Sequence, residues 1–224
     1  MESSAMNRIP APILGDLDRA FALVEHEPDA RPWLNELLSA IALPPRGQAV
    51  VLGTRLGSPA RTFAQQHPNW LVTALDPSVA LLSASLDAVR PAGLSAQLTM
   101  LQAQPTELPL PAQSVDAILG DFPLAHIADR KQLNTWATTC ARALSPDGVL
   151  AVRVAASRCT SAMVEQALQG WSPPYRSLLR PVWLASFELQ TIIEALRQAH
   201  FDRVSVEPAL SLPHAVSHVV VAKP

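Results

Sequence analysis

One stretch of the chain has the order strand, glycine loop, helix, strand and acid, and it constrains the fold strongly. The apolar run Ala49 to Leu52 leads into a loop that holds Gly53 and Gly57. After a helical segment, a second apolar run from Leu71 to Leu75 ends on Asp76. This is the pattern of a βαβ unit of the nucleotide-binding kind, in which an acid after the second strand accepts hydrogen bonds from ribose.

Composition narrows the class of protein further. The 224 residues suit one large α/β domain, or one domain with a small appendage. Hydrophobic residues make up 49% and charged residues 16%, which supplies a core and argues against wholesale disorder. The formal net charge of -2 requires no basic face, which argues against nucleic acid as a primary partner.

The cysteines and the N-terminal residues indicate the cellular compartment in which we expect the protein. Cys140 and Cys159 lack C-x-x-C spacing, so we expect neither a disulfide framework nor a metal site, and a cytoplasmic location. The first residues lack the apolar core of a signal peptide. No apolar run approaches the ~20 residues of a membrane span, so none is expected.

Periodicity and turn signals predict the order of elements. We expect helices over 14–42, 59–67, 78–90, 130–144 and 186–199, and strands at about 49–53, 71–75, 98–101, 115–119, 149–154, 203–207 and 217–222. Ser58 is expected to cap the second of these helices, and Ser145 to Gly148 to form a turn. His200 is expected at a helix end, since histidine tolerates left-handed backbone better than most residues.

The alternation of strands and helices predicts an α/β fold with a doubly wound, seven-stranded, mostly parallel, Rossmann-like sheet. The last two strands lack an intervening helix, so the last strand should run antiparallel. We expect residues 1–46 to form an N-terminal helical extension and 47–224 the main domain. The long connection 155–184 is the candidate lid or substrate-binding insertion.

Three local motifs carry a family resemblance that covers roughly residues 47–223. They are VVLGTRLGSP with LVTALDPS, then TELPLPAQSVDAILGDFPLAHI, and then ARALSPDGVLAV. Together with the predicted sheet, they resemble the class I S-adenosylmethionine-dependent methyltransferases. The closer likeness is to the small-molecule branch that includes the ubiquinone, menaquinone and biotin-pathway methyltransferases.

The resemblance implies S-adenosylmethionine as cofactor and a set of residues that bind it at strand ends. These are Gly53, Thr54, Arg55 and Gly57 in the loop, Asp76 and Pro77 after the second strand, Gln104 after the third, and Gly120 after the fourth. Asp76 would hold the ribose; alternatively Asp76 or Ser78 caps the next helix. The amide oxygen of Gln104 would accept from the adenine amino group. The two loop glycines either shape the cofactor loop or form a plain turn.

Three positions depart from the family pattern. Gly53 stands where the family usually has an acid near the end of the first strand. Arg55 stands where a loop glycine is usual, and it would either block the methionine part of the cofactor or bind its carboxylate. Pro105 follows Gln104 where a backbone N–H is commonly used, and proline has none.

The acceptor side of the predicted site lies after the fourth strand and in the lid. Asp121 would face the substrate or cap a helix, and Phe122 would pack on adenine or substrate or belong to the core. His126 is a candidate base, with a partly buried polar residue as the alternative. Tyr175 and Arg176 in the lid would contact substrate or simply lie on the surface.

Two functions remain open at this point. The first is methyl transfer from S-adenosylmethionine to an oxygen, nitrogen or carbon of a small organic molecule, which makes the protein an enzyme. The second is a methyltransferase-like protein, a pseudoenzyme, that lost cofactor binding and acts as a binding or scaffolding partner. The N-terminal helices would cover the active site or form the surface of a homodimer or a protein partner.

Overall fold

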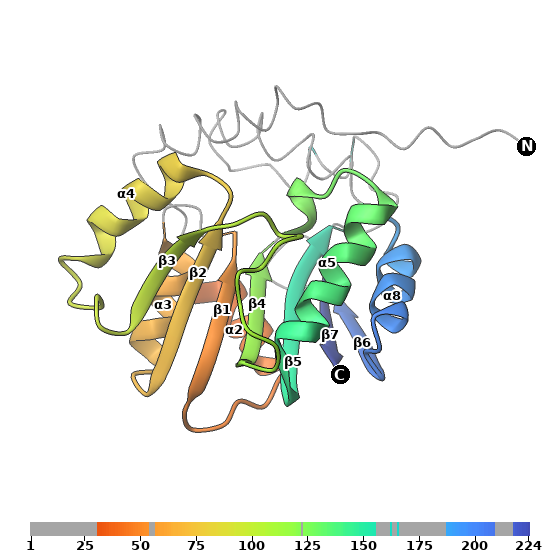
Figure 1. Cartoon of the computed structure of the whole chain (residues 1–224), viewed down its shortest axis with the longest axis horizontal. Helices are drawn as coiled ribbons and strands as arrows, with labels where there is room; N and C mark the ends of the chain where they lie inside the picture. The colour runs from red at the N-terminus through yellow and green to blue at the C-terminus, as the bar shows by residue number, and fades with distance from the viewer. Residues whose placement is uncertain are drawn as a thin grey trace, which may run out of the picture.

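The computed structural model describes residues 31–53, 57–121, 123–155, 162, 165, 187–208 and 217–224. Its sheet has seven strands in the order β3-β2-β1-β4-β5-β7-β6 (Figure 1). The strands are β1 (Gly47–Leu52), β2 (Trp70–Asp76), β3 (Leu98–Gln102), β4 (Val115–Asp121), β5 (Leu144–Ala155), β6 (Arg203–Pro208) and β7 (Ser217–Lys223). Strands β3, β2, β1, β4 and β5 pair in parallel, and β7 pairs antiparallel with both β5 and β6. The predicted doubly wound fold with an antiparallel last strand is confirmed.

Helices cover both faces of this sheet, which is the reason that its central strands are continuously apolar. The described helices are α2 (Arg31–Ser39), α3 (Ser58–Gln66), α4 (Val79–Val89), α5 (Arg130–Ala143) and α8 (Leu189–Gln198), with a 3-10 turn η1 (Pro123–His126). In Figure 1, α5 and α8 lie in front of the sheet while α2 and α3 lie behind it. None of these described helices combines the length and the apolar character needed to cross a bilayer.

Alternate residues of each strand therefore enter two separate cores. Val50 and Leu52 of β1 face the core under α5 and α8, whereas Ala49 and Val51 face the core under α2 and α3. The predicted stripe of α5 is confirmed, since Leu133, Trp136, Ala137 and Cys140 are all fully buried. Burial raises the pKa of the Cys140 thiol, so this group is a packing residue and not a nucleophile.

Helix α5 begins with a reciprocal cap. The Asp129 carboxylate accepts from the backbone N–H of Gln132 at 2.8 Å, and the Gln132 amide oxygen accepts from the N–H of Ala128 at 2.8 Å. This arrangement satisfies donors that the first helical turn leaves without intrahelical partners. At the end of α8, His200 has a φ of 65°, which confirms its predicted place in the left-handed region after a helix.

Two predicted boundaries were wrong. Ser58 is the first residue of α3 and not its cap; the cap is Gly57, at φ 85°, with no side-chain hydrogen bond. Strand β5 starts at Leu144, so Ser145 to Gly148 lie within its bounds, where the register against β4 shifts between Val115 and Ala117. A β-bulge absorbs the extra residues there, and turn-forming residues inside a strand are typical of such a bulge.

The connection between β3 and β4 forms no helix, and hydrogen bonds from side chains of α5 fix its position. Arg142 donates to the carbonyl oxygens of Leu110 at 2.8 Å and Leu108 at 3.1 Å. The Thr139 hydroxyl donates to the Thr106 carbonyl at 3.2 Å. These bonds fix Leu108, which is 4% exposed, against the ends of the central strands.

We expect Gly57→Ala to destabilise the protein more than Gly93→Ala does. Both glycines have positive φ, 85° and 71° respectively, so alanine pays a similar backbone penalty of about 1 kcal/mol at each. A Cβ on Gly57 would also lie 3.0 Å from Cβ of Ser85 and 3.3 Å from Cε of Met100, whereas one on Gly93 meets nothing within 4 Å.

The measurement is the free energy of unfolding in urea for the two variants. Gly57→Ala should lose about 1 kcal/mol more than Gly93→Ala, because only the first site is crowded. Equal losses would show that Ser85 and Met100 move aside without a measurable change in the free energy of unfolding.

Candidate functional site

The candidate site lies where the strand order reverses. Strand β1 pairs with β2 on one side and with β4 on the other, so the chain turns to the opposite half of the sheet at this point. Open α/β sheets bind ligands in the crevice outside the carboxyl ends of the strands at such a position. The predicted residues that follow β1, β2, β3 and β4 therefore meet at one edge.

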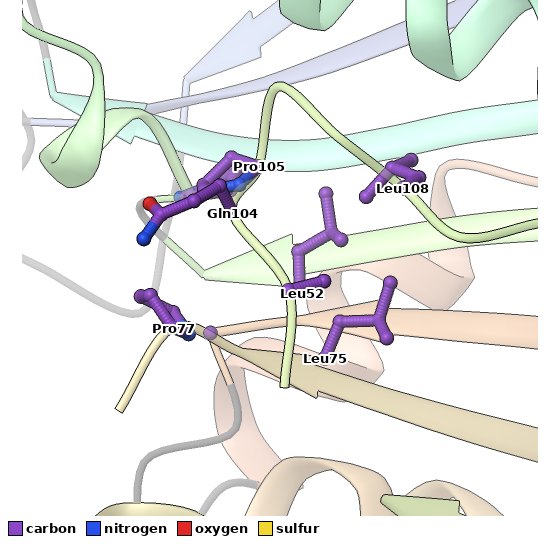
Figure 2. A pocket seen from close by; sticks show the side chains of 9 residues that line it. Leu52, Leu75, Pro77, Gln104, Pro105 and Leu108 are labelled. Atoms are coloured by element: carbon purple, nitrogen blue, oxygen red, sulfur yellow. The ribbon is translucent and has the colours of Figure 1, made fainter. Parts of the chain in front are cut away.

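A small, shallow apolar recess opens at this edge. It is lined by Leu52, Gly53, Leu75, Pro77, Ala103, Gln104, Pro105, Leu108 and Pro123. Figure 2 shows Gln104 and Pro105 on one side of the recess and Pro77 on the other, with Leu52, Leu75 and Leu108 nearer the sheet. Three of the predicted cofactor residues, Gly53, Pro77 and Gln104, thus share one cavity.

Asp76 ends β2 next to this recess and is almost fully buried, with 2% of the residue exposed. Its Oδ1 accepts from the backbone N–H of Ser78 at 2.9 Å, at the start of α4. This bond forms an Asx turn directly before α4, whereas a capping side chain would accept from an N–H inside the first helical turn.

Glycine is required at the three site positions for three different structural reasons. Gly53 adopts φ 71° and donates its N–H to the Leu75 carbonyl at 3.0 Å, which turns the chain sharply after β1. Gly57 caps α3 with the positive φ already described. Gly120 lies in a crowded place, where a Cβ would come within 2.9 Å of the Pro123 ring. Gly120 therefore lets Pro123 close one side of the recess.

Gln104 and Pro105 form the rim of the recess that comes from β3. Gln104 is exposed. Its backbone carbonyl accepts from the backbone N–H of Glu107 at 2.9 Å, and this bond fixes a turn. Pro105 is buried. The rim is tied to β2 by two more bonds, from the N–H of Ala103 to the Asp76 carbonyl at 3.2 Å and from the Gln102 amide to the Pro77 carbonyl at 3.2 Å.

Asp121 ends β4 with a fully buried side chain, and its Oδ1 accepts from Nε of Arg153 at 2.5 Å. Arg153 is its register partner on β5 and is itself 4% exposed. Asp121 thus belongs to a buried ion pair, and its role toward a substrate or as a helix cap stays a prediction.

Arg153 is the residue that sequence analysis missed. A cation in the apolar run VLAVRVA of β5 is itself an unusual signal, since buried arginines are almost always paired. Its partner could not be read from the sequence, because the register of β5 against β4 depends on the bulge. Pro123 and Leu108 were missed as well, and they enter the site only through the folding of two loops.

Several predicted site residues lie outside the part of the chain that the structure describes. These are Thr54, Arg55, Phe122, Tyr175 and Arg176, together with nearly all of the predicted lid at 155–184. The backbone of His126 ends η1, but its side chain is not among those described. Within the described residues, no group of three or more His, Cys, Asp or Glu side chains is arranged to hold a metal ion.

Comparison with known proteins gives one family and several similar structures. Residues 50–148 match the family described as a methyltransferase domain. A SAM-dependent methyltransferase from Aquifex aeolicus superposes with a TM-score of 0.67 at 17% identity, over 92% of this chain and 97% of that one. Phosphoethanolamine N-methyltransferase 2 of Haemonchus contortus, solved with S-adenosyl-L-methionine, gives 0.65 at 18% identity, over 88% of this chain and 43% of that one.

One curated relative matches a shorter stretch. The bovine (Bos taurus) U6 snRNA (guanine-N(2))-methyltransferase THUMPD2 is 38% identical over 68 residues, which are 30% of this chain and 14% of that protein. The matched stretch is thus about a seventh of that relative's length, and the low identities of the superposed structures establish the fold alone. The family match, the strand order and the site at the switch point agree. Residues 50–148 thus match a methyltransferase domain, and the strand order agrees with the resemblance to the class I S-adenosylmethionine-dependent methyltransferases.

Proposed function

We propose that this protein transfers a methyl group from S-adenosylmethionine to a small organic molecule. The observation that carries the proposal is the apolar recess beside buried Asp76 at the switch point of the sheet. An apolar slot with one polar rim residue suits a flat heterocycle, and an adjacent carboxylate suits a diol. Adenosine combines these two chemical features.

Each part of the cofactor has residues that fit it. Leu52, Leu75 and Leu108 would contact the faces of adenine, and the Gln104 amide oxygen would accept from its amino group. Asp76 would accept from the ribose hydroxyls while it keeps its bond to Ser78. Gly53 has a positive φ directly after β1, and the loop that begins there would take the methionine part.

The chemistry needs little from the protein beyond placement. The sulfonium of the cofactor supplies an electrophilic methyl group when bound. The protein must hold an acceptor atom in line with the S–CH₃ bond, and such positioning alone lowers a barrier substantially. This is consistent with the buried state of Asp121, since a site that works by positioning does not require an exposed base.

Separate measurements decide which class of acceptor is methylated and whether the protein is a pseudoenzyme. A small molecule fits the acidic net charge of -2. The short match to an RNA methyltransferase makes RNA the second acceptor class, and that class requires RNA binding that weakens as salt rises. A non-catalytic scaffold requires that neither S-adenosylmethionine nor S-adenosylhomocysteine binds.

The first experiment is calorimetric titration of the protein with S-adenosylmethionine and S-adenosylhomocysteine. We expect micromolar binding by the natural sequence and a loss of at least about tenfold in Asp76→Asn, because a charged acceptor of the ribose disappears. No heat and no thermal shift at millimolar ligand would overturn the proposed function.

The choice of Asn at position 76 separates ligand binding from the turn before α4. Asn keeps an oxygen that accepts from the N–H of Ser78, so Asp76→Asn should retain most of the thermal stability. Asp76→Ala should lose this hydrogen bond as well, at a cost of about 1 kcal/mol in the free energy of unfolding. If both variants bind like the natural protein, Asp76 holds only the turn before α4.

The adenine contact is tested at Gln104. We expect Gln104→Leu to weaken binding of S-adenosylhomocysteine by about threefold to tenfold, since one neutral hydrogen bond is lost. Gln104→Glu keeps an acceptor and should bind within about threefold of the natural protein. Glu107→Gln, an exposed neighbour outside the recess, is the matched control. Unchanged affinity in Gln104→Leu would remove this residue from the site.

A further inference from the structure

The apolar recess offers few main-chain donors to a ligand. Prolines have no N–H, and the lining includes Pro77, Pro105 and Pro123. The N–H of Gly53 donates to the Leu75 carbonyl at 3.0 Å, and the N–H of Ala103 donates to the Asp76 carbonyl at 3.2 Å. Leu52 and Leu75 lie in strands that are paired on both sides. Most of the N–H groups around the recess are therefore missing or already used.

The carbonyl groups of the rim are used in the same way. The Pro77 carbonyl accepts from the Gln102 amide at 3.2 Å, and the Gln104 carbonyl accepts from the N–H of Glu107 at 2.9 Å. Among the described residues that line the recess, Gln104 alone has a polar side chain. Its amide has no hydrogen bond with any other described residue, so it remains available to a ligand.

A side-chain amide can recognise either a donor or an acceptor. Its oxygen accepts and its NH₂ group donates, and a half turn about the last side-chain bond exchanges the two. The 6-amino group of adenine is a donor, whereas the 6-oxo group of hypoxanthine is an acceptor. The Gln104 amide can therefore make one hydrogen bond to either base.

A site that distinguishes these two bases needs a fixed group at the neighbouring ring nitrogen. This nitrogen is an acceptor in adenine, whereas in hypoxanthine it carries a hydrogen and donates. A main-chain N–H facing it would favour adenine, because two opposed donors both stay unpaired. The next main-chain nitrogen after Gln104 belongs to Pro105, a buried lining residue that cannot supply such a donor.

We propose that the recess binds a purine nucleoside without distinguishing a 6-amino from a 6-oxo group. This inference rests on the proposed function and concerns the specificity of the same site. Gln104 contacts the group at carbon 6 in either case, and Pro105 imposes no donor on the adjacent ring nitrogen. The ligand class is therefore the S-adenosyl compounds together with their S-inosyl analogues.

Pro105 also has a structural role, which the experiment must separate from base recognition. The bond from the N–H of Glu107 to the Gln104 carbonyl closes a four-residue turn with Pro105 at its second position, where proline is favoured. A proline that serves the turn alone affects the stability of the link between β3 and β4. The ratio of two ligand affinities separates these roles, because a loss of stability weakens both ligands alike.

The test is calorimetric titration with S-adenosylhomocysteine and S-inosylhomocysteine, which differ only in the base. The natural protein should bind the two with dissociation constants within about threefold of each other. Gln104→Glu offers only acceptors, so it should prefer S-adenosylhomocysteine by at least about tenfold. Pro105→Ala introduces an N–H, so the preference should shift toward S-adenosylhomocysteine by at least about threefold.

Pro109→Ala is the matched control, because Pro109 is an exposed proline of the same link outside the recess. It should leave the affinity ratio unchanged. Gln104 is exposed, so Gln104→Glu still tests the inference if Pro105→Ala does not fold. A larger preference of the natural protein for either ligand, or an unchanged ratio in Gln104→Glu, would overturn the inference while the proposed function stands. Binding of neither ligand by the natural protein would overturn both.

Discussion

Burial of the central strands on both faces governs the rest of this structure. Because α2 and α3 cover one face and α5 and α8 the other, the middle of β1 and β4 admits only apolar side chains. Polar side chains are displaced to the strand ends, where Asp76, Gln104 and Asp121 lie with the turn at Gly53. The site is a consequence of this packing, since the chain reverses its winding direction at the same edge.

The link between β3 and β4 shows how the packing shapes the site without a helix. Prolines at 105, 109 and 111 prevent regular structure there, and α5 supplies the missing partners through Arg142 and Thr139. Leu108 is pressed into the recess as a result. The apolar recess therefore depends on α5, which itself contributes no residue to its lining.

Local patterns predicted most of the elements, and the failures have a common physical origin. The α5 stripe, the antiparallel β7 and the turn at His200 follow from periodicity and from intrinsic backbone preference, which act within a few residues. The cap at Gly57 and the early start of β5 depend on tertiary contacts with Ser85 and β4. The same limit applies to the site, where Asp76 was found by its place after β2 but the Asp121–Arg153 pair required the register between two strands.

Charge at the sheet edge brings these observations together. The acid that the family usually carries after the first strand is replaced by Gly53, which removes one carboxylate from the methionine end. The two carboxylates described at this edge each have a partner, the N–H of Ser78 for Asp76 and the guanidinium of Arg153 for Asp121. At the ends of β1 and β4 the described chain thus has Asp121 as its carboxylate, and the guanidinium of Arg153 lies against it.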